Sequence, residues 1–154
     1  GPFVKLNQKV MIIPGNHETA ATVDFLSQLY NVRNLHGYYL KPKTGDIGIF
    51  GAGGANIGPH EIGEDEMFTL LNKAHKSVSD SKTKIMVTHV HPEGSKMERL
   101  TNIFPGSTSV TKAIKDFKPD VLLCSHVHEA EGIEEKVGST KVINVGKKGK
   151  IIEL

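Results

Sequence analysis

Residues 84–92 have the sequence KIMVTHVHP, a short apolar run that ends in two histidines. Two further segments share this design, namely 9–18 (KVMIIPGNHE) and 121–128 (VLLCSHVH). Each run is apolar on both faces, which is typical of a strand buried within a parallel sheet. In open α/β sheets ligands bind at the carboxyl ends of the strands, so we expect the three polar clusters to converge there.

The segments around these strands carry helical and hairpin patterns, which indicates an α/β fold. Apolar residues recur at helical spacing in three segments, which are 19–30, 64–78 and 107–117. Further strands are predicted at 38–40 and 47–50, as a hairpin around the turn 42–46, and at 141–145 and 150–154, around the turn 146–149. The glycine-rich segment 51–63 and the segment 92–106 are predicted to be loops.

The composition is that of an ordinary globular chain, with 154 residues, of which 38% are hydrophobic and 23% charged. A chain of this length is expected to form one domain. The single cysteine excludes an internal disulfide and favours a reducing, cytoplasmic location. No apolar run approaches the ~20 residues of a membrane-spanning helix, so we expect no membrane association. A net charge of +2 argues against nucleic acid as a partner.

The three strand ends supply an amide oxygen from Asn16 and imidazoles from His89, His126 and His128. Imidazole is the commonest metal ligand near neutral pH, and such mixed sites suit Mn, Fe, Zn or Ni. His126 and His128 lie two residues apart, so an extended backbone would direct both side chains to one face. They would then either share one metal ion or each bind one ion of an adjacent pair. His17 adjoins Asn16 on the turn and would point in a different direction.

Taken together, the three clusters resemble a known set of motifs. The sequences GNHE at 15–18, THVHP at 88–92 and SHVH at 125–128 are similar to the third, fourth and fifth motifs of the calcineurin-like metallophosphoesterases. Several other segments look like the Icc-related predicted phosphoesterases, namely 34–37, 51–54, 118–120, 126–129 and 140–146. The resemblance implies a metallophosphoesterase-like β-sandwich flanked by helices, and a phosphatase or phosphodiesterase that acts on small phosphate esters.

The resemblance also implies roles for individual residues. In that family two metal ions lie roughly 3.5–4 Å apart and clamp a phosphoryl group, which a metal-bound hydroxide attacks. By correspondence with the motifs, Asn16, His89 and His126 would bind one ion and His128 the other. His17 would face the phosphate, where it would stabilise charge or protonate the leaving oxygen.

Four other features have either a functional or a purely structural interpretation. His91 would either contact a metal ligand without binding the ion itself, or bind a metal ion adventitiously. His60 would reach the substrate from the glycine-rich loop. Cys124 lies in an apolar run and is expected to be a buried small hydrophobe. The lysines in the segment 147–150 are expected to form a solvated turn.

Two motifs of the family are missing from the front of the chain. No Asp-x-His precedes Asn16, and the only Gly-Asp, at 45–46, falls after the third motif in a predicted turn. A strand–helix–strand unit takes about 30 residues, so roughly 60 residues of the family fold, with its first two strands, are expected to be absent. Residues 1–154 are therefore expected to be the C-terminal portion of a single metallophosphoesterase domain, with at most one metal ion and impaired activity on their own.

Three explanations of these missing motifs stay open. The chain is a piece of a larger protein, or a partner chain covers the open edge of its sheet, which would make self-association expected. Alternatively, the domain is a metal-free scaffold that serves as an interaction module. A purely structural zinc site is less favoured, because such sites commonly use several cysteines and the chain has one.

Overall fold

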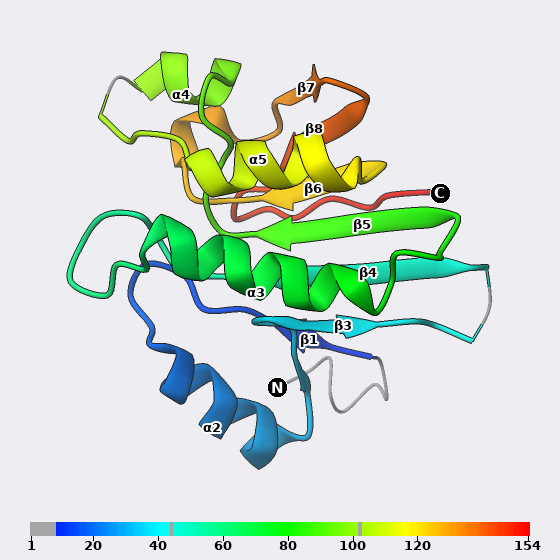
Figure 1. Cartoon of the computed structure of the whole chain (residues 1–154). Helices are drawn as coiled ribbons and strands as arrows, with labels where there is room; N and C mark the ends of the chain where they lie inside the picture. Colours follow the sequence, from blue (N-terminus) through cyan, green and yellow to red (C-terminus); the bar gives the residue numbers. More distant parts are fainter. Residues whose placement is uncertain (1–8, 44, 102) are drawn as a thin grey trace.

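The computed structural model describes residues 9–43, 45–101 and 103–154. Its main feature is a six-stranded sheet in the order β3-β4-β5-β6-β8-β7 (Figure 1). The strands of this sheet are β3 (Tyr38–Leu40), β4 (Ile47–Ala52), β5 (Thr83–Thr88), β6 (Val121–Cys124), β7 (Glu134–Val137) and β8 (Thr140–Asn144). The four central strands run parallel, whereas β3 and β7 pair antiparallel at the two edges. The expected mixed α/β fold is confirmed.

Two helices, α3 (Glu64–Lys76) and α5 (Thr108–Phe117), lie side by side on one face of this sheet (Figure 1). A row of residues in register across the central strands is fully buried in the core beneath the two helices, and it consists of Phe50, Met86, Leu122 and Val142. Because side chains alternate along a strand, this register directs every second residue of each strand into the core.

The opposite face of the sheet carries a smaller apolar cluster. Ile85, Val121 and Ile143 are buried there, and Ile152 from the C-terminal segment packs against them. Both faces of the central strands are therefore apolar, as their sequences predict.

The first strand lies outside the main sheet. β1 (Met11–Ile12) pairs in parallel with β2 (Arg33–Asn34) in a separate two-stranded sheet. Its end is nevertheless tied to the main sheet, because the Gly54 N–H donates to the Pro14 carbonyl oxygen at 2.7 Å. Glycine is required beside this contact, since a Cβ at Gly53 would overlap the same oxygen. The turn that follows β1 is thereby fixed at the carboxyl end of β4.

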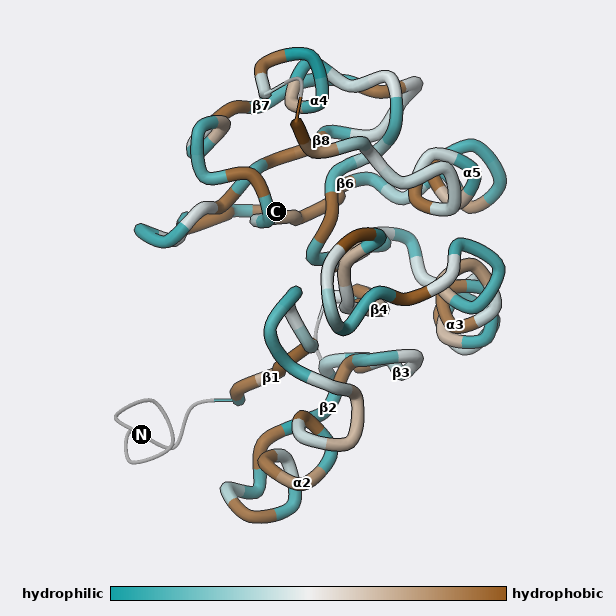
Figure 2. The backbone as a smooth tube through the Cα atoms, turned by 90° about the vertical axis from the view of Figure 1, so that its left-hand side faces the viewer, coloured by the Kyte–Doolittle hydropathy of each residue, from teal (hydrophilic) through white to brown (hydrophobic). Residues whose placement is uncertain are grey.

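The helix α2 (Ala20–Tyr30) forms as predicted, with the Thr19 hydroxyl accepting from the Thr22 N–H at its start. It lies beside β1 and β2, apart from α3 and α5 (Figure 2). Its apolar residues are largely uncovered: Val23 is buried, but Phe25 is 63% and Leu29 is 60% exposed.

Two predictions at the level of elements are wrong. The segment 150–154 forms no strand, because β8 lies between β6 and β7 and has no free edge for it. The predicted loop 92–106 contains the helix α4 (Lys96–Thr101), whose first N–H groups bond to Glu135 and Ser95. After β6 the backbone is extended at Val127, and the short 3₁₀-helix η1 (His128–Ala130) begins at the second histidine.

The hairpin of β3 and β4 is confirmed, with Tyr39 opposite Phe50. Thr44, in its predicted turn, lies outside the described residues. Among the helices that the structure describes, none has the length and apolar character needed to cross a lipid bilayer.

Candidate functional site

A cavity of about 540 Å³ opens at the carboxyl ends of β5 and β6. Five of its lining residues are those that the motifs single out, namely Asn16, His17, His89, His126 and His128. They come from the turn after β1, the end of β5 and the segment after β6. The structure thus places together three clusters that are far apart in the sequence.

The two central histidines are positioned by the backbone. The His89 carbonyl oxygen accepts from the N–H groups of Ser125 and His126, at 3.1 and 2.9 Å. This bridge continues the pairing of β5 with β6 past the last residues of both strands. As a result the two imidazole rings meet edge to face, with centroids 4.8 Å apart.

A side-chain hydrogen bond of 2.9 Å joins His126 Nδ1 to His89 Nε2. The other ring nitrogen of His126, Nε2, is buried and has no hydrogen-bond partner among the described residues. Phe104 packs edge-on against the His126 ring, with centroids 5.0 Å apart. Burying such a nitrogen without a partner costs free energy.

Burial keeps these imidazoles uncharged. Burial, together with smaller effects of the neighbouring rings of His126, His128 and His17, lowers the pKa of His89 to about 4. The pKa of His126 is lowered as well, with burial as the main cause. Near neutral pH both rings are therefore uncharged. Each neutral ring has one lone pair, and the hydrogen bond between the rings occupies one of these two lone pairs.

The turn at 15–18 forms the opposite wall of the cavity. The Gly15 N–H donates to Glu18 Oε2 at 2.9 Å, which closes the turn. Asn16 Nδ2 donates to His17 Nε2 at 3.3 Å. A Cβ at Gly15 would lie 2.9 Å from Glu18 Oε2, so a side chain at position 15 would displace that carboxylate. His17 and Glu18 are exposed, and they face the cavity mouth rather than the core.

These residues suit a metal ion in their chemistry but only in part in their arrangement. Neutral imidazole and amide oxygen are ligands for divalent transition metals. Within the ranges 9–43, 45–101 and 103–154, however, no three His, Cys, Asp or Glu side chains come together as a metal-binding group. The paired rings of His89 and His126, with Asn16 on the facing wall, are a partial ligand set rather than a closed two-metal centre.

Two of the histidines singled out from the sequence lie elsewhere. His91 is 1% exposed, and neither of its ring nitrogens has a hydrogen-bond partner in the described part of the chain. It does not line the cavity, and it acts on His126 by lowering that ring's pKa. His60 is exposed and lines a second cavity. Between His126 and His128 the backbone is extended at Val127, and both histidines line the first cavity.

Sequence reasoning missed four residues that line the site, which are Glu18, Phe104, Glu129 and Lys147. Lys147 was expected only on a solvated turn, but that turn follows β8, the parallel neighbour of β6, and so reaches the same edge of the sheet. The turn is held by hydrogen bonds from the Gly146 N–H to Asn144 Oδ1 and from the Lys148 N–H to Glu131 Oε1. Glu18 is part of the GNHE motif, whereas no sequence pattern around Phe104 indicates that it lines the site.

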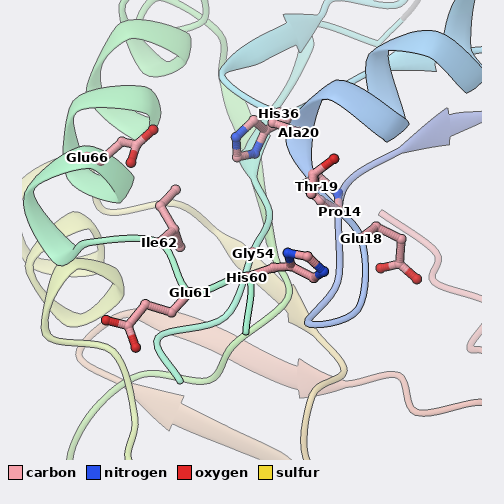
Figure 3. A pocket seen from close by; sticks show the side chains of 10 residues that line it. All are labelled: Pro14, Glu18, Thr19, Ala20, His36, Gly54, His60, Glu61, Ile62 and Glu66. Carbon is pink, nitrogen blue, oxygen red and sulfur yellow. The ribbon is translucent and has the colours of Figure 1, made fainter. Parts of the chain in front are cut away.

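The second cavity, of about 220 Å³, adjoins the first, and Glu18 lines both. Figure 3 shows Glu66 of α3 and Glu61 on one side and Glu18 on the other, with the rings of His36 and His60 between them. His36 Nδ1 accepts from the Gly53 N–H at 2.9 Å, so in the neutral ring the proton is on Nε2. Burial lowers the pKa of His36, which favours this neutral form.

Comparisons with known proteins identify a family and a fold. A family model described as metallophosphoesterase, calcineurin superfamily, matches residues 3–150. An uncharacterized protein of Methanocaldococcus jannaschii is 30% identical over 145 residues, which are 88% of this chain and 63% of that protein. The chain therefore spans less than two thirds of the length of this relative.

Solved structures share the fold at low sequence identity. One crystal structure matches 95% of this chain with a TM-score of 0.72 and 20% identity, over 60% of its own length. The protein TT1561 of Thermus thermophilus matches 92% of this chain with a TM-score of 0.69 and 18% identity, over 64% of its length. The sulfate thiohydrolase SoxB of the same organism matches with a TM-score of 0.55 and 14% identity, over 97% of this chain and 30% of that one. At these identities the likeness concerns the fold alone.

Proposed function

Because the chain belongs to the calcineurin superfamily of metallophosphoesterases, we propose that it carries part of the site of a metal-dependent phosphoester hydrolase. The observation that supports this most is the hydrogen-bonded pair of neutral imidazoles, His89 and His126, in a cavity that Asn16, His17 and His128 also line. The substrates are small phosphate esters, either monoesters or diesters.

Asn16, His89 and His126 would hold one divalent ion, and His128 would contribute to a second. Such ions neutralise phosphate charge and activate water, and Mn, Fe, Zn and Ni are all compatible with these ligands. Since the described residues form no three-ligand group, the chain on its own is proposed to bind at most one ion and to be impaired in activity.

The chain's own residues would carry the remaining tasks. His17 lies at the cavity mouth, where its imidazole would stabilise phosphate charge or donate a proton to the leaving oxygen. Lys147 lines the same cavity as His128 and would attract the anionic ester. Phe104 packs on His126 and would keep water from that ring.

The test combines metal content with activity. The wild-type chain, loaded with Mn²⁺, should bind about one ion and melt at a higher temperature than after chelation, because a metal that binds only the folded state stabilises it. His89→Ala should lower metal affinity by at least about 100-fold, more than the loss typical for a residue that merely supports a ligand. Hydrolysis of p-nitrophenyl phosphate and bis-p-nitrophenyl phosphate should fall in parallel.

His60→Ala is the matched control, because it removes an exposed histidine outside this cavity and should leave metal affinity unchanged. A wild-type chain that binds no metal ion, and whose melting temperature is unaffected by chelator, would contradict the proposal. That result would favour the second candidate, a non-catalytic scaffold on the same fold. Self-association through an open sheet edge stays a prediction.

A further inference from the structure

His91 is a buried polar side chain that the proposed reaction does not use. It is 1% exposed, and neither of its ring nitrogens has a hydrogen-bond partner among the described residues. Burying unpaired polar atoms costs free energy, and an apolar side chain of similar size would fill the same space without that cost. Packing alone therefore does not explain why a histidine lies at this position.

His75 shows what a buried histidine with a structural role looks like in this chain. Its Nε2 is also buried without a partner among the described residues. However, its ring stacks on Phe117, with centroids 4.2 Å apart, and meets Phe50 edge to face at 5.3 Å. In the described part of the chain no aromatic ring packs on His91 in this way. Aromatic packing thus accounts for His75 but not for His91.

The carboxylates near His91 are already hydrogen-bonded to the backbone. Burial lowers the pKa of His91, while the Phe104 backbone, Glu98 and Glu135 act in the opposite direction. Glu98 accepts from the N–H groups of Gly94 and Gly106, and Glu135 accepts from the first N–H of α4. These carboxylates therefore stabilise the loop around α4, and neither makes a hydrogen bond to the imidazole.

The ring of His126 lies near His91 and also has an unpaired nitrogen. After burial itself, His91 is the largest cause of the lowered pKa of His126. Phe104 adjoins both histidines, because its ring packs edge-on against His126 and its backbone acts on the His91 ring. His126 is 8% exposed, and its buried Nε2 has no partner among the described residues. Unpaired ring nitrogens of both histidines are thus buried around Phe104.

We propose that His91 is a positioning residue for His126, and that it accepts the hydrogen bond of the His126 Nε2–H through one buried water molecule. The Phe104 carbonyl oxygen favours a proton on the His91 nitrogen nearest to it, which leaves the other nitrogen as an acceptor. The two imidazoles and this carbonyl oxygen supply the polar partners that a buried water needs.

The consequence for His126 concerns its other nitrogen. With the proton on Nε2, the lone pair of the ring is on Nδ1, which faces His89 and accepts from the His89 Nε2–H in the metal-free chain. A hydrogen bond to one nitrogen of a histidine commonly decides which nitrogen can bind a metal ion. The proposal rests on the proposed function, because His126 is one of the ligands proposed above.

The first experiment determines the His126 tautomer in the metal-free protein by ¹⁵N NMR of the imidazoles, at about pH 8, where they are uncharged. Protonated and unprotonated ring nitrogens have well-separated chemical shifts. The wild-type chain should carry the proton on Nε2. In His91→Leu, which keeps a similar volume but has no nitrogen, the proton should be distributed over both positions. His91→Gln should restore the wild-type tautomer, because its amide oxygen can accept the same hydrogen bond.

His75→Leu is the matched control. It also removes a buried imidazole with an unpaired nitrogen, but this imidazole does not line the first cavity. It should leave the His126 signals unchanged, even where it lowers the melting temperature. A wild-type His126 with its proton on Nδ1 would overturn the proposal, and this measurement needs no variant to fold. An unchanged tautomer in a folded His91→Leu would overturn it as well.

Mn²⁺ affinity is the second measurement. His91→Leu should bind Mn²⁺ about tenfold more weakly than the wild-type chain, a usual effect of removing the partner of a metal-binding histidine, whereas His91→Gln should bind it nearly as tightly. An equal loss in the two variants would mean that only the shape of His91 matters, and would contradict the proposal.

Failure of the positioning role and failure of the hydrolase function give different results. If the wild-type chain binds no Mn²⁺ but the His126 tautomer depends on His91, the hydrolase function fails and the positioning role stands. If Mn²⁺ binds and phosphate esters are hydrolysed, but His91→Leu changes neither the tautomer nor the affinity, the positioning role fails and the hydrolase function stands.

Discussion

His89 and His126 differ from the other histidines in how their ring nitrogens are used. One hydrogen bond joins the two rings, and His126 Nε2 is left buried without a partner among the described residues. Cys124, two residues before His126, is the opposite case: it is buried as predicted, and burial raises the pKa of its thiol to about 12. Burial thus keeps the imidazoles uncharged and makes the thiol unreactive.

Lys147 carries a prediction at the scale of one residue. Lys147→Gln should raise KM for a phosphate ester about fivefold and change kcat little, because an exposed cation contributes about 1 kcal/mol to anion binding. Lys147→Arg, which keeps the charge, should retain most of the wild-type affinity. Steady-state kinetics against ester concentration measure both.

Lys148→Gln is the control for this prediction. Lys148 takes part in the turn through its backbone N–H, which donates to Glu131, and its side chain does not line the cavity. An equal rise of KM in Lys148→Gln would show that overall charge, rather than the position of Lys147, attracts the ester.

The helices α2 and α3 have similar lengths but differ in how they are packed. In α3 one side is fully buried against β4 and α5, with Met67 and Leu71 both 0% exposed. In α2 only Val23 and Ser27 are buried, while Leu29 is 60% exposed. The stability of α2 therefore depends more on its end caps, at Thr19 and Asn31, than on packing.

A pair of leucines tests this difference between the elements. Leu71→Ala in α3 should lower the free energy of unfolding by about 2–5 kcal/mol, the usual cost of a cavity in a packed core. Leu29→Ala in α2 should change it by only about 0.5 kcal/mol, as is usual for an exposed position. Urea denaturation of the two variants provides the measurement, and equal losses would mean that Leu29 is covered in solution.

At the scale of the whole molecule, several histidines are neutral because they are buried or partly buried. Burial is the first cause of a lowered pKa in His36, His75, His89, His91 and His126. In the unfolded chain these groups take up a proton near their ordinary pKa of about 6.5, whereas in the folded chain they do so only at lower pH. Protonation therefore favours the unfolded state.

The resulting contribution to stability is complete above about pH 6.5 and is lost as the pH falls through the folded-state pKa values. For His89 that window extends down to a pKa of about 4. We expect the urea midpoint of the metal-free protein to fall steadily between about pH 7 and about pH 4.5, and His89→Gln to reduce the fall. A midpoint that stays constant over this range would contradict the prediction.

Much of this molecule could be predicted from local patterns. The strands at 84–88 and 121–124 and the helices after 64 and 107 have strong apolar periodicity, and the structure has them at those places. The convergence of His89 and His126 also follows from where their apolar runs end. The resemblance to known motifs predicted the family, and the family model that matches residues 3–150 confirms it.

The remaining features depend on contacts that no local pattern contains. Both 134–137 and 150–154 are short and partly polar, so their sequences do not show which of them pairs with β8. In the structure 134–137 takes this position. Phe104 and Lys147 reach the site through tertiary packing of loops, so neither has a signal nearby in the sequence. The position of the end of β1 beside the main sheet follows from the contact of Pro14 with Gly54, which is distant in the sequence.

The parallel order of β4, β5, β6 and β8 has a consequence for how this protein folds. Parallel neighbours are joined by long crossovers, so the cavity between residue 16 and residue 147 closes only after every crossover has been completed. Contacts between residues so distant in sequence form slowly, because the entropy of closing each intervening loop is lost first. The histidine pair should accordingly assemble late in folding, and a single cut in the chain between β5 and β6 would separate its two members.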